Sequence, residues 1–278
     1  MWCRIGSMST SSLSLRNIFH LPNPVGFLRE MDCRGQLSSI DHHIAKMAEL
    51  GRNSRQDKDL FDHSLKVLEN AISHENDSAD VVLRAAAFLH DVGKSATRRV
   101  VPGRGVTFDG HEVVGARIIK PSLIKGGFSS AEVKQITELI RLHMRSHGFT
   151  RGDKKMWNDS AVRRLMNEVS SEEQLERLVI IFRSDVTSKH ASKRAAVQRQ
   201  VDRLVTEMDR IRAADSRSAM RPALDGNKVM EILGIDPGPA LGRVMKFLNS
   251  DEGILLSEDE AINMIVEKFG SSKNVSHV

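Results

Sequence analysis

Residues 78–93 read SADVVLRAAAFLHDVG, and this stretch decides the fold. From Val81 to Leu89 its apolar face is almost unbroken, and a helix that is apolar nearly all round is predicted to lie at the centre of a protein. Ser78 is a candidate N-cap for this helix, and Gly93 is a candidate C-cap. His90 and Asp91 lie near the end of this stretch, so two polar side chains stand at the end of the most apolar helix in the chain.

Helical periodicity extends outward from this stretch in both directions. Only 4% of the residues are aromatic and none is tyrosine, so a core of aliphatic side chains is expected, which suits helices better than sheets. Short β-prone runs around Pro102–Gly105 predict one small hairpin or loop. The sequence therefore predicts an all-α protein with helices near residues 24–40, 42–50, 60–70, 81–93, 112–123, 130–144, 160–169, 171–188, 191–212, 226–233, 239–250 and 258–269.

Charge and cysteine content limit the environments in which this chain works. Lysine and arginine number 41 against 36 acidic residues, a mild excess that permits an acidic partner such as RNA without requiring one. Cys3 and Cys33 lack CxxC neighbours, so neither a zinc site nor a disulfide framework is expected. No apolar run approaches the roughly 18 residues of a membrane helix, and we expect a cytoplasmic protein without membrane contact.

The beginning of the chain is interpreted separately. MWCRIGSMSTSSLSLRNIF (residues 1–19) is rich in serine, contains no acidic residue and weakly resembles a transit peptide. We favour a simpler interpretation, in which residues 1–20 are an unstructured end or translation begins at Met8.

Histidine and aspartate side chains are the strongest functional signal. Such ligands suit divalent ions of hard or borderline character, and a buried carboxylate is costly unless a cation compensates it. One such histidine alone would more often be a hydrogen-bonded core residue. The whole set favours a metal ion held between helices. Its members are His63, His90, Asp91, His111, His143 and Asp185.

The order His63, His90–Asp91, Asp185 resembles the HD superfamily of metal-dependent phosphohydrolases. Longer segments, LFDHSLKVLENA, LRAAAFLHDVGKSATRRVV, GVTFDGHEVVGARI and LDGNKVMEILGIDPGPALGRVMKFL, resemble bacterial CCA-adding tRNA nucleotidyltransferases that carry an HD domain. The likeness runs from about Pro24 to the C-terminus, and the Asp-x-Asp pair of the family's nucleotidyltransferase head is not found. We therefore expect remnant neck helices (21–55), an HD domain (56–190) and a basic helical body and tail (191–278).

The resemblance implies a function for particular residues. It implies that Mg, Mn or Ni binds to His63, His90, Asp91 and Asp185, and that His111 and His143 are candidate ligands for a second ion. Asp91 and Lys94 are the expected catalytic residues, acting on 2′,3′-cyclic phosphates or phosphomonoesters at tRNA 3′ ends. Alternatively, Lys94, His111 and His143 are ordinary residues at the surface or at helix ends, with no role in binding or catalysis. The residues expected to bind tRNA are Lys189, Lys193, Arg194, Arg199 and Arg203.

Two competing hypotheses remain at this stage. The chain could be the non-catalytic, tRNA-binding half of a CCA-adding enzyme whose head is encoded separately or was lost. It could also be an inert remnant of a truncated gene. Because a full set of ligands is present, we favour the hydrolase, with tRNA and a separate head as expected partners and no role for DNA.

Overall fold

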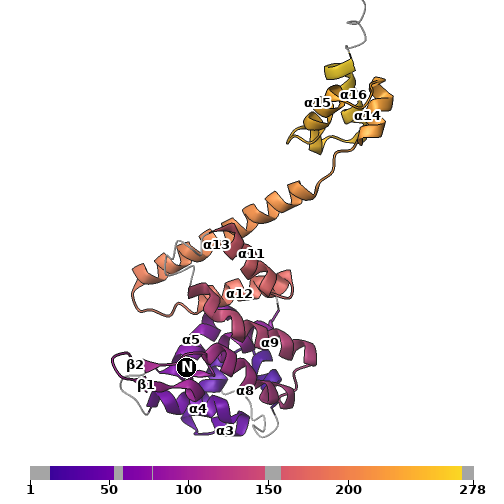
Figure 1. Ribbon diagram of the computed structural model, residues 1–278. Coiled ribbons are helices and arrows are strands. Elements are labelled where there is room, and N and C mark those ends of the chain that lie inside the picture. Colours follow the sequence, from indigo (N-terminus) through magenta and orange to yellow (C-terminus); the bar gives the residue numbers. More distant parts are fainter. Residues whose placement is uncertain (1–12, 53–58, 77, 148–157, 271–278) are drawn as a thin grey trace, which may run out of the picture. The chain divides into compact units, whose positions relative to one another are not determined.

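The computed structural model describes residues 13–52, 59–76, 78–147 and 158–270 (Figure 1). The predicted all-α fold is confirmed, because the strands of the described residues form a single two-stranded hairpin. The chain divides into two compact units at Asp209–Arg210, and helix α13 (Ala191–Ala219) crosses this boundary. In the described ranges no helix combines the length and apolar character needed to span a membrane.

The elements of the first unit follow one another through short connections. Most of its helices are one to four turns long, and neighbours in sequence often pack together. In chain order they are α1 (Leu15–His20), α2 (Pro24–Cys33), α3 (Leu37–Ile40), α4 (His42–Arg52), α5 (Leu60–Ile72), α6 (Val81–Leu89), α7 (Lys94–Thr97), β1 (Arg99–Val101), β2 (Gly105–Thr107), α8 (His111–Lys125), α9 (Ser130–Leu142), η2 (His143–Arg145), α11 (Asp159–Glu168) and α12 (Glu172–Ser184).

Helix α6 is the centre of the first unit, as its apolar sequence predicts. All nine of its residues are buried, and it packs against α1, α5, α9 and α12. Its N-cap is Asp80 and not the predicted Ser78, because the Asp80 carboxylate accepts a hydrogen bond from the Leu83 backbone N–H. The buried Arg84 forms an ion pair of 2.5 Å with Glu75 and donates to the carbonyl of Phe19. This pairing compensates the burial of its charge.

The prediction that residues 1–20 are unstructured is wrong for Leu15–His20, which form α1. Ser14 caps this helix, and Leu15, Ile18 and Phe19 are buried in the unit. Their spacing is the i, i+3, i+4 pattern of a helix face, which the serine-rich surroundings obscured. Residues 1–12 of the predicted unstructured end, and residues 53–58 of the predicted polar break, lie outside the described residues.

The predicted role of Gly93 as a C-cap is also wrong. Helix α6 ends at Leu89, and Gly93 has a φ of −69°, which is available to any residue. Its neighbours explain why glycine stands here. A Cβ at this position would lie 2.0 Å from the carbonyl oxygen of His111 and 2.6 Å from the backbone nitrogen of Gly115. Gly93 therefore permits the start of α8 to lie directly against the His90–Asp91 turn.

Two other helix ends differ from the sequence prediction. Helix α12 ends at Ser184, so Asp185 is its C-cap residue and begins the loop to α13. Helix α13 continues beyond Arg212 to Ala219, close to Pro222, which cannot donate a backbone hydrogen bond. The predicted starts of two helices are confirmed. Ser129 forms a complete capping box with Glu132 at the start of α9, and Ser171 caps α12.

The predicted hairpin is confirmed. Strands β1 and β2 are antiparallel, with Arg99 opposite Thr107, Val100 opposite Val106 and Val101 opposite Gly105. Gly103 and Gly105 both have a φ of 75°, the left-handed conformation that glycine adopts most readily in a tight turn. The hairpin begins two residues after α7 and ends four residues before His111.

The second unit contains three helices beyond the end of α13: α14 (Gly226–Leu233), α15 (Pro239–Leu248) and α16 (Glu258–Phe269), with a short 3₁₀ turn, η4 (Gly253–Leu255). The first and last of these match their predicted bounds. The unit has its own small core, made by residues from each helix and from the segment before α14. The core consists of Leu224, Val229, Leu233, Val244, Leu248, Ala261 and Ile265.

The close approach at Gly93 generates a stability prediction. Gly93→Ala should destabilise the first unit by about 1–3 kcal/mol, because the added methyl group meets backbone atoms that cannot move alone. Urea unfolding followed by circular dichroism would measure this. Gly242→Ala, in α15 with nothing within 4 Å of its Cβ position, is the matched control and should be neutral or stabilising. Equal stability of Gly93→Ala and the parent protein would contradict the proposed reason for this glycine.

Candidate metal centre

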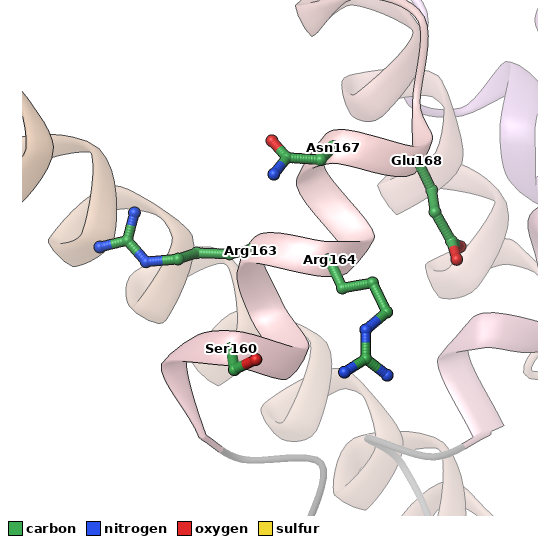
Figure 2. Close-up of a pocket in the computed structure, with 5 residues that line it drawn as sticks. All are labelled: Ser160, Arg163, Arg164, Asn167 and Glu168. Atoms are coloured by element: carbon green, nitrogen blue, oxygen red, sulfur yellow. The ribbon is translucent and has the colours of Figure 1, made fainter.

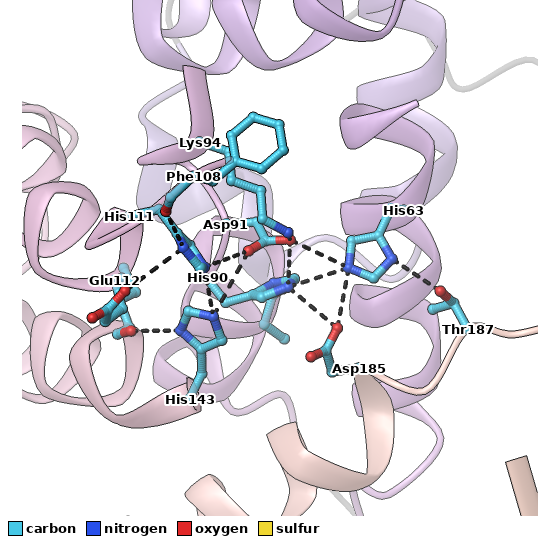
Figure 3. Close-up of polar contacts among 12 residues, drawn as sticks. His63, His90, Asp91, Lys94, Phe108, His111, Glu112, His143, Asp185 and Thr187 are labelled. Carbon is cyan, nitrogen blue, oxygen red and sulfur yellow. Dashed lines mark hydrogen bonds and ion pairs between the residues drawn. The ribbon is translucent and has the colours of Figure 1, made fainter. Parts of the chain in front are cut away.

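Four histidines and two aspartates converge inside the first unit (Figure 3). They come from six positions spread over more than 120 residues of sequence, and each lies in or at the end of a packed helix. His63 is in α5, His90 and Asp91 follow α6, His111 begins α8, His143 follows α9, and Asp185 follows α12. The structure thus brings together every residue that the sequence suggested as a metal ligand.

The six side chains form two groups of three. In the first group, the Nε2 atom of His63 lies 3.1 Å from Oδ1 of Asp185 and 3.3 Å from Nε2 of His90. The Nε2 atom of His90 lies 3.4 Å from the same Asp185 oxygen. Within each group the ligand atoms all lie within 4.8 Å of one another, which is close enough for one ion to contact all three.

Asp91 belongs to the second group and also faces the first. Its Oδ1 atom lies 3.1 Å from Nε2 of His111 and 3.7 Å from Nε2 of His143. Its Oδ2 atom lies 3.2 Å from Nε2 of His90 and 3.5 Å from Nε2 of His63. Each carboxylate oxygen of Asp91 therefore faces a different pair of imidazoles, which is the arrangement of a bridging ligand between two ions.

Backbone carbonyls fix the orientation of three of the imidazoles. The Nδ1 atom of His90 lies 2.9 Å from the carbonyl oxygen three residues earlier, and the same contact is 2.9 Å for His111 and 2.7 Å for His143. A carbonyl oxygen can only accept, so Nδ1 carries the proton and Nε2 is left as the unprotonated atom of the neutral ring. Metal-binding histidines are held in this way, with the second ring nitrogen donating to a fixed acceptor.

His63 is oriented differently, by a residue that the sequence analysis missed. Its Nδ1 atom lies 2.9 Å from the hydroxyl oxygen of Thr187, two residues beyond Asp185. Asn70 lies seven residues after His63 in the same helix, α5, and its side chain donates a hydrogen bond of 2.9 Å to the carbonyl of Ser184. Two contacts thus join α5 to the loop that carries Asp185. The sequence offers little to identify them, because threonine and asparagine are common in helices and loops.

The charges of the centre are strongly coupled. Burial would lower the pKa of His90, but the charges of Asp91 and Asp185 outweigh it and raise that pKa to about 10. Burial would raise the pKa of both carboxyls, but contacts with the histidines hold each pKa well below its usual range. Burial and the charge of His90 lower the pKa of His143 to about 3. These shifts favour the cationic form of His90 and the neutral form of His143.

The donor set fits a divalent ion better than it fits a protonated cluster. His111 and His143 direct their Nε2 atoms at one another over 3.2 Å, and His63 and His90 do so over 3.3 Å. Two nitrogen lone pairs that face each other at this distance repel unless a proton or a metal cation lies between them. One proton can bridge only one of the two histidine pairs at a time. Because imidazole nitrogens and carboxylate oxygens are ligands for divalent ions, a metal would satisfy all these atoms together.

Lys94 lies at the edge of the cluster. Its Nζ atom donates to Oδ2 of Asp91 over 2.5 Å, and it sits 5.8 Å from the centre of the Phe108 ring. Figure 3 shows Lys94 and Phe108 together beside Asp91. The interpretation of Lys94 as a solvated helix-end lysine does not fit this geometry, because only 28% of its side chain is exposed.

A second feature of the first unit is a polar surface hollow on α11 (Figure 2). None of the six clustered residues lines it, so the hollow is separate from the candidate metal centre. Its Glu168 forms an ion pair of 2.9 Å with Arg145. The residues that line it are Ser160, Arg163, Arg164, Asn167 and Glu168.

A helical bundle that holds a His, His–Asp, Asp series around one buried centre defines a domain of the HD class. The sequence profile of the HD domain matches residues 60–214, and this chain belongs to the HD-domain family. Domains of this family bind divalent metals and form a superfamily of metal-dependent hydrolases. The conclusion confirms the family that the sequence predicts.

Two curated proteins resemble the chain over about two thirds of its length. The A-adding tRNA nucleotidyltransferase of Deinococcus radiodurans is 31% identical over 193 residues, which are 68% of this chain and 42% of that enzyme. The CC-adding tRNA nucleotidyltransferase of Thermus thermophilus is 31% identical over 186 residues, which are 66% of this chain and 39% of that enzyme. The chain thus matches about two fifths of each enzyme, which fits the portion that carries the HD domain.

The raised pKa of His90 generates a prediction about metal binding. Because this histidine is protonated below about pH 10 in the metal-free centre and must be neutral to bind a metal, binding releases a proton. The apparent affinity for Mn²⁺ should therefore rise about tenfold per pH unit between pH 6 and 8. Titration calorimetry in buffers of different ionisation enthalpy would count the released protons. An affinity independent of pH would contradict the protonation of His90.

Proposed function

We propose that this protein is a metal-dependent phosphohydrolase that removes phosphate groups from RNA 3′ ends, with 2′,3′-cyclic phosphates and phosphomonoesters as its substrates. The main support for this proposal is the position of Asp91, whose two carboxylate oxygens face two groups of imidazoles. Two ions about 3.5–4 Å apart are a recurrent arrangement in enzymes that hydrolyse phosphate esters. Similarity to tRNA nucleotidyltransferases supports RNA, and tRNA in particular, as the substrate.

In this proposal each ligand has a defined role. His63, His90 and Asp185 would hold one ion, and His111 and His143 would hold the other, with Asp91 facing both groups. Bound Mg²⁺, Mn²⁺ or Ni²⁺ would supply a Lewis acid and a water of lowered pKa. The chain's own residues provide the rest: backbone carbonyls aim the imidazoles of His90, His111 and His143, and burial shields these rings and Asp91 from bulk water.

Lys94 is proposed to have two effects. Its ammonium group holds Oδ2 of Asp91 in place and thereby positions the bridging carboxylate. It also keeps one positive charge at the exposed edge of the cluster, where it can neutralise an oxygen of a bound phosphate as a point charge. A catalytic role for Asp91 and Lys94 was expected from the resemblance, and their direct contact supports it.

The hydrolase prediction can be tested with 2′,3′-cyclic AMP. Mn²⁺-loaded protein should hydrolyse it, with Mg²⁺ and Ni²⁺ assayed separately, and Asp91→Asn should lose at least about a hundredfold in rate because the bridging charge is removed. The matched control is Asp62→Asn, an identical change at a side chain that is 55% exposed on α5. Metal-loaded, folded protein with no activity on cyclic or 2′-phosphorylated nucleotides would refute the hydrolase proposal.

A second candidate function is the binding of tRNA without catalysis, and the basic start of α13 favours it. Lys189, Lys193, Arg194, Arg199 and Arg203 are exposed, although Arg194 also donates a hydrogen bond to the carbonyl of Ser188. Lys189 belongs to the loop that begins at Asp185, so this surface starts four residues from a metal ligand. Phosphate contacts of this kind need no base-reading side chains.

The binding surface generates its own prediction. The double variant Lys193→Glu, Arg199→Glu should bind tRNA at least about tenfold more weakly, and the slope of log affinity against log salt should fall by about one unit per lost contact. Fluorescence anisotropy over a salt series would measure both. The control is Lys120→Glu, Lys134→Glu, which reverses two exposed charges on α8 and α9. Equal binding by the two double variants would exclude α13 as the RNA-binding surface.

A further inference from the structure

The β1–β2 hairpin exposes an apolar side chain in the segment between α7 and α8. Val100 is 70% exposed. The register places it directly opposite Val106, so both side chains project from the same face. Phe108 follows β2 directly, because the strand ends at Thr107.

The residue that follows the hairpin contacts the candidate metal centre. The Phe108 ring lies 5.8 Å from Nζ of Lys94, and that atom donates to Oδ2 of Asp91 over 2.5 Å. The carbonyl of Phe108 accepts the Nδ1–H of His111. Phe108 thus lies beside Lys94 and, through its carbonyl, beside His111, and both of these side chains contact Asp91 (Figure 3).

The charge of the hairpin indicates what this face accepts. Residues 98–109 contain Arg98, Arg99 and Arg104 and one acidic residue, Asp109, whose carboxylate lies 3.9 Å from the Arg104 guanidinium. The side chains of Arg99 and Arg104 are exposed. An apolar face with arginines around it matches a nucleotide, which combines a flat base with negatively charged phosphates. A simple inorganic or aliphatic phosphate would use only the charges.

We propose that the β1–β2 hairpin is a nucleoside-binding arm of the metal centre, in which the Val100–Val106 face accepts the base of the terminal nucleotide whose phosphate lies at Asp91. The proposal rests on the hydrolase function and adds a source of selectivity: nucleotides are preferred over other phosphomonoesters. The arginines bind phosphates of the same RNA strand. Apolar contacts to the base select for a nucleoside without selecting strongly among bases, because every base has an apolar face.

Two secondary-alcohol phosphomonoesters separate the hairpin from the metal chemistry. Adenosine 2′-phosphate and glycerol 2-phosphate present the same type of ester, and only the first carries a base. Val100→Asp should raise KM for adenosine 2′-phosphate roughly tenfold, leave kcat nearly unchanged and leave glycerol 2-phosphate unaffected, whereas Val100→Thr should have a smaller effect. Ile124→Asp is the control, because Ile124 is 59% exposed on α8.

A binding measurement makes the test independent of turnover. Adenosine, which has no phosphate to lose, should shift the NMR signals of the Val100 and Val106 methyl groups, and glycerol should not. If the shifts occur but neither ester is hydrolysed, the nucleoside-binding arm stands and the hydrolase proposal fails. If both esters are hydrolysed and Val100→Asp changes neither KM, the hydrolase stands and the arm is refuted. Methyl signals that do not respond to adenosine also refute it.

Discussion

The buried carboxylate of Asp91 is the constraint on which the first unit depends. A negative charge inside a helical bundle is stable only if cations, hydrogen-bond donors or a metal surround it, and five side chains surround this carboxylate. His90 and Lys94 approach from its own turn, while His63, His111 and His143 approach from α5, the start of α8 and the end of α9. Helices that share no sequence motif must therefore bring their ligands to one point. Helices α5, α9 and α12 do so by packing around α6, and α8 does so by packing against α7 and α9. Gly93 belongs to the same requirement, since it lets the first turn of α8 reach Asp91.

Much of this arrangement follows from the sequence. The apolar stretch before His90 predicts a central helix, and the family resemblance supplies the order of ligands, so the all-α fold and the membership of six residues in one set were predictable. Their division into two groups was not, because it depends on which oxygen of Asp91 faces which imidazole. Helix ends were the weakest predictions. At Gly93 a sequence pattern for a cap matched a residue whose real constraint is a contact with the backbone of another helix, 18 residues away at His111.

Residues that orient the ligands were also beyond sequence analysis. Three of the four imidazoles donate to backbone carbonyls, which leave no mark in the amino-acid sequence. The fourth uses Thr187, an ordinary loop residue until the fold brings it to His63. The α1 helix was missed for a related reason: its three buried apolar residues are too few to stand out against a serine-rich segment. Both cases show that short-range composition is a poor guide where tertiary contacts decide the structure.

The two means of orienting histidines have different evolutionary consequences. Since a backbone carbonyl is present whatever the side chain, the sequence can drift at Ala87, Phe108 and Ile140 without altering the tautomers of His90, His111 and His143. His63 differs, because its hydrogen-bond partner is the hydroxyl group of Thr187, which a substitution can remove. The orientation of His63 therefore depends on a residue outside the motif that gives the family its name.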